Sequence, residues 1–320
     1  MNLDNPIFQD ANAAREHLEA MQWPNGPVCP HCGNVDGERI TTMKGKAHRP
    51  GLYNCMECRK QFSVTVGTVF ERSKIALNKW LLATFLVASS KKGMSAHQLH
   101  RMLGVTYKTA WFMAHRIREA MKEDVSSSGP IGGEGKTIEA DETYIGKRED
   151  QAMPAYREGK PYKSKKLGTK KQTVFALVER GGRVRSFHVP SATKEGLREI
   201  LFTNAPRTST LYTDESRFYT ETGKEYAGHE TVNHSAKEYA RGIVHTNTIE
   251  NVFSVFKRGM TGVYQHCAEK HLHRYLAEFD FRYNRRTALK ISDQERHDML
   301  LAAIRGKRLT YRRIGEAANA

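Results

Sequence analysis

Two pairs of cysteines, each separated by two residues, restrict the fold of this chain more than any other feature. They are Cys29 with Cys32, in CPHC, and Cys55 with Cys58, in CMEC. Zinc prefers four ligands in a tetrahedron, and each C-x-x-C turn supplies two thiolates from one tight loop. The surrounding segment, about forty residues of short strands and turns, buries too little apolar surface to fold unaided. The cysteines therefore predict a zinc ribbon with one structural Zn²⁺, in preference to a redox pair or disulfides.

The charge balance indicates what kind of partner the chain has. The formal net charge is +16 at pH 7. A surplus of this size favours a polyanion such as nucleic acid, because each basic side chain near a phosphate releases counterions. A basic protein without such a partner is the alternative. The sequence lacks both an apolar run of about 18 residues and a signal-peptide pattern, so we expect a cytoplasmic protein with no membrane partner.

A helical region follows the ribbon. Ser95 is a suitable N-cap for a helix over 96–103, and a short turn at Gly104 precedes a second helix over 107–121. Two helices joined by such a turn are typical of a helix-turn-helix, whose second helix can lie in the major groove. A helical hairpin that packs on a neighbour is the alternative. Four side chains of the second helix are expected to be exposed and to contact DNA: Lys108, His115, Arg116 and Arg118.

The second half of the chain predicts an α/β domain. Its order is strand, hairpin, helix, strand, short strand and helix, which indicates a mixed sheet with helices against it. The first strand is expected to end near Asp141, and a later one, in TSTLYTDES, runs into Asp214. Residues 146–171 form a polar loop that we expect to be mobile. The expected parts are an N-terminal helix (1–25), the ribbon (26–71), the helix-turn-helix (72–125), a linker (126–136), the α/β domain (137–290) and a basic C-terminal tail (291–320).

The segment TNTIENVFSVFKRG, residues 246–259, predicts a helix with two different faces. Its apolar residues repeat at helical spacing, and its polar residues repeat on the other side. A solvated surface produces the same pattern. Asp141 and Asp214 favour a functional interpretation, because each lies at or near the end of an apolar strand, where α/β folds gather their chemistry. Glu250 can join them from the helix.

Three converging carboxylates repel one another unless cations offset their charge. Mg²⁺ (or Mn²⁺) prefers carboxylate and water oxygens and leaves positions open for phosphate. Two such ions, about 3.5–4 Å apart, can serve a phosphodiester transfer. We therefore predict a two-metal site of Asp141, Asp214 and Glu250. Lys257 is expected to reach a phosphate, and Asn247 and Asn251 to orient a ligand.

At this point a family resemblance is plain. The segments CPHCGN and YNCMECRKQFSVTVGTVFE resemble the ribbon of bacterial insertion-sequence DDE transposases of the zinc-ribbon, ISXO-like branch. EADETYIGKRE, YTDES, HTNTIENVFSVFKRG and HLHRYLAEFDFRYNRR resemble the catalytic core of that branch. The resemblance implies an RNase H-like core, a divalent-metal DDE site and DNA strand transfer at terminal inverted repeats. By this resemblance, the metal-binding acidic residues are Asp141, Asp214 and Glu250, and the downstream basic residue is Lys257.

Members of this group are described with Asn or His as the third ligand, so Asn247 and Asn251 are rivals to Glu250. We prefer Glu250, because an anion binds magnesium better than an amide does. Between Arg274 and Arg286, aromatic residues alternate with arginines. The rings can pack against the sheet, or the arginines can bind the DNA backbone. The basic residues expected at DNA in this domain are Lys257, Arg258, Arg282, Arg285 and Arg286.

The sequence therefore predicts a DNA transposase that binds the ends of an insertion sequence and catalyses metal-dependent strand cleavage and transfer. Its expected partners are terminal inverted repeats and target DNA, with a homodimer or larger assembly in the complex and the nucleoid as its site of action. One alternative is a DNA-binding regulator with an inactive core. Another is an RNase H-like hydrolytic nuclease that cleaves without joining.

Overall fold

The structure is a computed structural model that describes residues 3–45, 47–146, 156–157, 160–161 and 171–310. The chain divides into two compact units, one of residues 1–122 with 285–320 and the other of residues 123–284. Each unit is described by itself.

The first unit contains the ribbon and a group of helices. Its elements are α1 (Pro6–Gln9), α2 (Ala11–Gln22), β1 (Ile40–Thr42), β2 (Tyr53–Cys55), β3 (Gln61–Phe62), α3 (Leu77–Ser89), α4 (Ala96–Leu103), α5 (Tyr107–Met121) and α11 (Asp293–Ala302). The three strands form an antiparallel sheet in the order β1-β2-β3. The predicted bounds of α4 and α5 are confirmed, with Ser95 as the N-cap of α4 and Gly104 in the left-handed conformation after it.

Two predictions for this unit differ from the structure. The single N-terminal helix expected within residues 1–25 is two helices, because the Asp10 side chain accepts hydrogen bonds from the backbone of Asn12 and Ala13 and begins a second helix, α2. Residues 291–320 were expected to be a tail, but α11 forms within them. It packs on α3, where the buried His297 lies 2.9 Å from the hydroxyl of Thr84.

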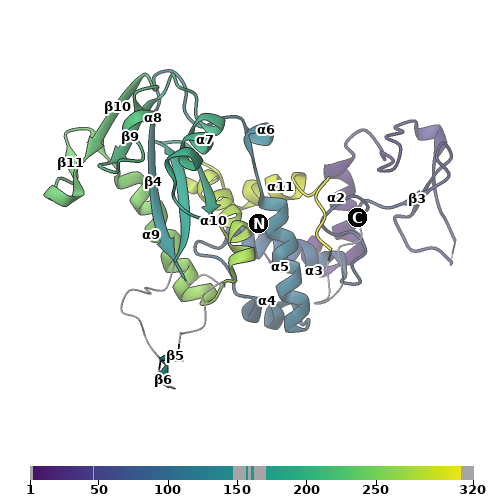
Figure 1. Ribbon diagram of the computed structural model, residues 1–320. Coiled ribbons are helices and arrows are strands. Elements are labelled where there is room, and N and C mark those ends of the chain that lie inside the picture. The colour runs from purple at the N-terminus through teal and green to yellow at the C-terminus, as the bar shows by residue number, and fades with distance from the viewer. Residues whose placement is uncertain (1–2, 46, 147–155, 158–159, 162–170, 311–320) are drawn as a thin grey trace. The chain divides into compact units, whose positions relative to one another are not determined.

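The second unit contains the mixed sheet (Figure 1). Its elements are α6 (Val125–Ser128), β4 (Thr137–Ile145), β5 (Tyr156–Arg157), β6 (Lys160–Pro161), β7 (Gln172–Glu179), β8 (Val184–Val189), α7 (Lys194–Asn204), β9 (Thr210–Asp214), α8 (Thr220–Gly223), β10 (Gly228–Val232), β11 (Ala240–Arg241), β12 (Val244–His245), α9 (Asn247–Gly259) and α10 (Leu272–Asn284). The sheet order is β10-β9-β4-β7-β8, with β4, β7 and β8 antiparallel and with β9 and β10 parallel to β4.

Both faces of this sheet are covered. Alternate residues of β7 point to opposite sides: Val174 and Ala176 pack with α9 and α10, whereas Phe175 and Leu177 pack with α7. The arrangement confirms the predicted α/β class, a mixed sheet with flanking helices, preceded by a ribbon and helices. It also places the strands that carry Asp141 and Asp214 side by side.

Other expectations for this unit are revised. The first strand does not end near Asp141 but continues to Ile145. The linker expected over 126–136 includes α6 and is tied to β8, because Arg183 donates to the carbonyl of Pro130 and Arg185 to that of Gly129. Most of the loop expected over 146–171 lies outside the described residues.

Candidate active site and zinc centre

The four cysteines come together in the ribbon. Their sulfur atoms all lie within 4.8 Å of one another. The Cys29 and Cys58 sulfurs are 3.7 Å apart, as are those of Cys32 and Cys55. Tetrahedral zinc with bonds of about 2.3 Å requires sulfurs about 3.8 Å apart, so the donor set fits Zn²⁺.

Each pair of cysteines lies on a tight turn. Gly33, after the first pair, and Arg59, after the second, have positive φ angles of 77° and 56°. The turn after the second pair aims the backbone N–H of Cys58 at Cys55, and this hydrogen bond lowers the pKa of the Cys55 thiol to about 6. A lowered pKa favours the thiolate form that binds metal, whereas burial raises the pKa of the Cys58 thiol.

A cluster of aromatic rings packs between the ribbon and the end of α2. Trp23, at the end of α2, makes edge-on contacts with the rings of Tyr53 and Phe62, whose centroids lie 5.5 and 5.8 Å away. Tyr53 and Phe62 are themselves stacked across β2 and β3. The ribbon and the N-terminal helix, which we expected as separate parts, therefore share a small core.

In the second unit, strand register brings the first two acids together. The parallel strands β4 and β9 pair Ile138 with Leu211 and Glu139 with Tyr212. The same offset, continued two residues further, sets Asp141 level with Asp214. Burial, and then the charge of Asp214, raise the pKa of Asp141 to about 8. Burial also raises the pKa of Asp214.

Helix α9 supplies the third acid. As predicted, its apolar face is buried, including Ile249 and Phe256, and Glu250 is exposed on the other face. The Thr246 hydroxyl donates to Glu250 at 3.2 Å, and the ring of His234 lies 3.7 Å from the same carboxylate. Glu250 is therefore oriented by its own helix turn and by the segment that follows β10.

The acids line one cavity of about 580 Å³. Its walls include Asp141, Glu142, Thr143, Asp214, Glu215, His234, Glu250, Phe253, Ser254, Lys257 and Arg258. The lining contains Glu250 and Lys257 but neither Asn247 nor Asn251. Within the described ranges, only the four cysteines form a group of three or more candidate ligand residues whose ligand atoms lie within 4.8 Å of one another. The three acids thus share a cavity, but their oxygen atoms do not all lie within 4.8 Å of one another.

Sequence reasoning missed several residues of this site. Glu142 was left out because its side chain points to the opposite face of β4; it accepts a hydrogen bond from the Tyr219 hydroxyl and still lines the cavity. Glu215 accepts hydrogen bonds from the backbone of His234 and Ser235 and holds that segment beside Asp214. The position of Glu215 directly after Asp214 could have indicated its role. No sequence pattern indicated His234.

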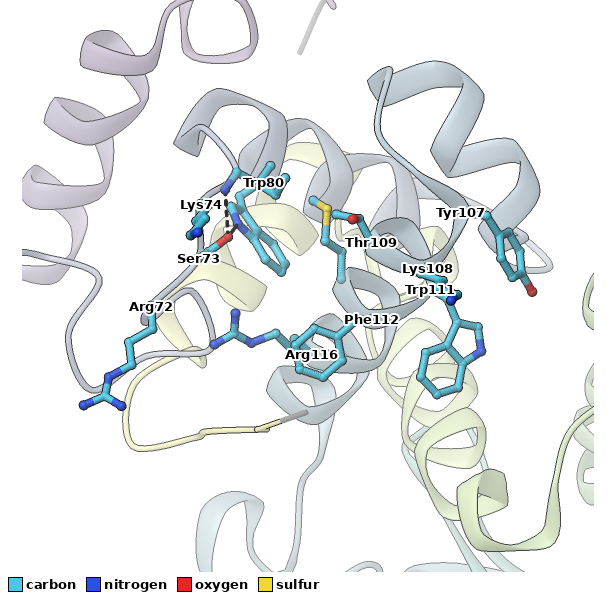
Figure 2. Close-up of a pocket in the computed structure, with 12 residues that line it drawn as sticks. Arg72, Ser73, Lys74, Trp80, Tyr107, Lys108, Thr109, Trp111, Phe112 and Arg116 are labelled. Carbon is cyan, nitrogen blue, oxygen red and sulfur yellow. Dashed lines mark hydrogen bonds between the residues drawn. The ribbon is translucent and has the colours of Figure 1, made fainter. Parts of the chain in front are cut away.

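The structure corrects the predicted exposure of α5. Lys108 is exposed, but the exposed fractions of His115, Arg116 and Arg118 are 1%, 6% and 3%. Arg116 donates to the carbonyl of Glu71 at 2.6 Å and lies against the aromatic wall of a cavity of about 600 Å³, shown in Figure 2. The helix buries these three side chains within the protein, and contact with DNA would require them to become exposed.

Of the other basic residues predicted to contact DNA, some are exposed and one is buried. Lys257 and Arg258 are exposed at the cavity, and Arg285 and Arg286 are partly exposed. Arg282 is buried, with an exposed fraction of 7%, because it pairs with Glu278. The expectation that Arg282 is available to DNA is therefore wrong for this structure.

Comparison with known proteins agrees with the sequence motifs. Residues 132–284 match the family described as ISXO2-like transposase domain, and residues 9–61 match the transposase zinc-ribbon domain. Together these matches cover more than half of the chain. The mixed sheet, the four-cysteine centre and these matches define a DNA transposase with a zinc ribbon. Within that class, residues 132–284 belong to the ISXO2-like transposase domain family, which confirms the predicted family.

Individual relatives are more distant. The chain is 29% identical over 286 residues to an uncharacterized protein in the transposable element ISH50 of Halobacterium salinarum, covering 86% of this chain and 91% of that protein. Among solved structures, a pre-cleavage Mos1 transpososome covers 60% of this chain and 72% of that chain, with 9% identity and a TM-score of 0.20. The Mos1 strand transfer complex covers 64% and 76%, with 10% identity and a TM-score of 0.20. Likenesses at that score support no conclusion.

No helix in the described part of the chain is long and apolar enough to cross a membrane.

Proposed function

We propose that this transposase cleaves DNA at the ends of an insertion sequence and joins the freed ends to target DNA, with Asp141, Asp214 and Glu250 as its metal ligands. The observation that carries the proposal is the shared cavity: three acids from β4, β9 and α9 line it together with Lys257. The charges of Asp214 and Glu250 add to burial in raising the pKa of Asp141, and such a cluster is suited to divalent cations. When bound, Mg²⁺ (or Mn²⁺) would activate the attacking hydroxyl and stabilise the leaving oxygen.

The residues of the chain supply the rest of the site. Asp141 and Asp214 present oxygens from a rigid sheet, and Glu250 presents one from the facing helix. Lys257 lies two turns further along α9 and places a positive charge where a phosphate of the DNA end can approach. Among the three rivals for the third ligand position, Glu250 is supported by its place in the cavity lining, which Asn247 and Asn251 do not share.

Partners and place of action follow from this chemistry. The substrates are the terminal inverted repeats and a target duplex, and two ends require two active sites, so the working complex contains at least two copies of the chain. The ribbon, with Lys108 and the exposed cations around the cavity, provides phosphate contacts. The protein acts where the DNA is, in the cytoplasm at the nucleoid.

A cleavage and strand-transfer assay on DNA carrying the element's ends tests the proposal. The wild type is expected to nick and join in Mg²⁺, and Asp214→Asn to bind without cutting. A matched control is Glu221→Gln, which changes an exposed glutamate outside the cavity lining and is expected to stay active. Wild-type protein that binds and never cuts would instead indicate a regulator, and cutting without joined product would indicate a hydrolytic nuclease.

A further inference from the structure

A fourth acid lies just before the first member of the predicted triad, and it is completely buried. Glu139 has an exposed fraction of 0% and precedes Asp141 by two residues in β4. Side chains two apart in a strand point to the same face, so Glu139 points toward α9, as Asp141 does. It is not among the residues that line the active-site cavity. A buried carboxylate is costly unless it is paired and hydrogen-bonded, which makes its partners informative.

Two of those partners belong to the first turn of α9. The carboxylate of Glu139 accepts hydrogen bonds from the backbone N–H of Ile249 at 2.9 Å and from the hydroxyl of Thr248 at 2.8 Å. The N-cap residue of the helix, Thr246, makes no side-chain capping bond of its own. Helix N-termini leave N–H groups unsatisfied and favour negative charge. Strand β4 therefore caps α9, and the capped turn is the one that carries Glu250.

A third partner, Arg180, fixes the other side of the carboxylate. It follows β7, and its Nε donates to Glu139 at 2.7 Å. The same guanidinium donates to the carbonyl oxygens of Ile243 at 2.6 Å and His245 at 2.7 Å, and it lies 4.7 Å above the ring of Tyr212. Arg180 thus holds the β12 segment that leads into α9 against β4, β7 and β9.

These contacts occupy both oxygens of the Glu139 carboxylate. One oxygen of Glu139 accepts from Arg180 and Thr248, and the other from Ile249. A metal ligand would need a free oxygen directed into the cavity, so Glu139 is not a fourth ligand in this arrangement. A buried ion pair is also weak evidence for stability, because desolvation offsets much of its attraction. A role in geometry accounts better for so complete a set of bonds.

We infer that Glu139 and Arg180 are positioning residues, which set the distance of Glu250 from Asp141 by clamping the start of α9 onto β4. The inference rests on the proposed function and deepens it. Asp141 is fixed by its place in the sheet, whereas Glu250 moves with the end of a helix. A misplacement of about 1 Å in a reacting group can cost about 100-fold in rate. The clamp is therefore a specific requirement of the metal site.

The test compares Glu139→Ala, Glu139→Gln and the wild type. Glu139→Ala removes the cap and leaves Arg180 without its carboxylate partner; we expect unchanged binding to end DNA, cleavage at saturating DNA slower by about 100-fold, and a higher Mg²⁺ requirement. Glu139→Gln keeps an acceptor for α9, so partial rescue is expected. The second readout needs no catalysis: calorimetric Mn²⁺ binding to the DNA-free protein should weaken in the same order.

A matched control separates position from stability. Asp280→Asn disturbs another carboxylate that joins a helix to the sheet, because Asp280 on α10 accepts two hydrogen bonds of 2.7 Å from Ser186 on β8. This variant should lose thermal stability without a change in Mg²⁺ requirement or Mn²⁺ affinity. The inference is overturned if Glu139→Ala keeps wild-type rate and metal affinity, or if Asp280→Asn shifts both equally. Wild-type protein that never cuts refutes the proposed function, and the Mn²⁺ comparison then still decides the clamp.

Discussion

The buried histidine of α11 makes the first unit sensitive to acid. His297 is 0% exposed and packs between the rings of Phe8 and Phe85, with its Nε2 2.9 Å from the hydroxyl of Thr84. Among the described residues, its Nδ1 has no hydrogen-bond partner. Protonation would add a buried charge and an unsatisfied N–H. Burial, followed by the charge of His17, accordingly lowers the pKa of His297 from 6.5 to about 3.

The size of the effect follows from that shift. Between pH 6.5 and about 3 the unfolded chain binds a proton at this position and the folded chain does not, so folding stability falls as the pH falls through this window. The full loss is of order 5 kcal/mol, at about 1.4 kcal/mol for each pH unit of the shift. From pH 7 to pH 5 alone, linkage gives a loss of about 2 kcal/mol.

The measurement is denaturant unfolding at pH 7 and pH 5, followed by tryptophan fluorescence. All three tryptophans, Trp23, Trp80 and Trp111, lie in the first unit, so the signal reports that unit. His297→Gln keeps a polar group near Thr84 and cannot titrate; its loss between the two pH values should be smaller than that of the wild type by about 2 kcal/mol. The control His48→Gln changes an exposed histidine. Equal pH dependence of His297→Gln and wild type would refute the reasoning.

Other predictions concern the two metal sites and the DNA contacts. Glu250→Gln should abolish cleavage while Asn251→Ala retains it, in the nicking assay; the opposite result would make Asn251 the third ligand. Cys55→Ser should lose bound zinc, measured by elemental analysis, and weaken end recognition, and unchanged zinc content would contradict the ribbon site. Lys257→Ala should reduce the slope of log affinity against log salt by about 0.9. Arg282→Ala should leave that slope unchanged and destabilise the protein by about 3–5 kcal/mol, because the buried Glu278 loses its cationic partner.

Local patterns in the sequence predicted what local physics determines. The bounds of α4 and α5 follow from caps, a turn glycine and helical periodicity, and the paired cysteines predicted the ribbon because ligand spacing is set by one tight turn. The buried face of α9 follows from the spacing of Ile249 and Phe256 for the same reason. These features need no knowledge of which distant segment packs against them.

The features that the sequence did not predict depend on distant partners. Arg116 looks like an exposed cation of a DNA-binding helix, yet the carbonyl of Glu71 and the rings of Trp80 and Phe112 bury it. Glu139 looks like one more charged residue of a strand, because its role depends on a helix that begins more than a hundred residues later. Periodicity shows which face of an element is apolar, but not which polar group of another element will meet it.

The balance of charge within the cavity separates its functional carboxylates from its structural ones. Glu142 accepts from the Tyr219 hydroxyl, and Glu215 accepts from two backbone N–H groups and the hydroxyl of Ser235. Asp141 and Asp214, in contrast, accept only one backbone N–H each among the described residues, and Glu250 accepts one hydroxyl. In a chain with a net charge of +16, these three acids lie together with no lysine or arginine within ion-pair distance in the described part of the chain. Burial, and then the charge of Asp214, raise the pKa of Asp141 to about 8, so ionisation of this site opposes folding unless a cation offsets the charge. Among the described residues, these carboxylates have no lysine or arginine partner, and they are the ones that the DDE motif assigns to metal.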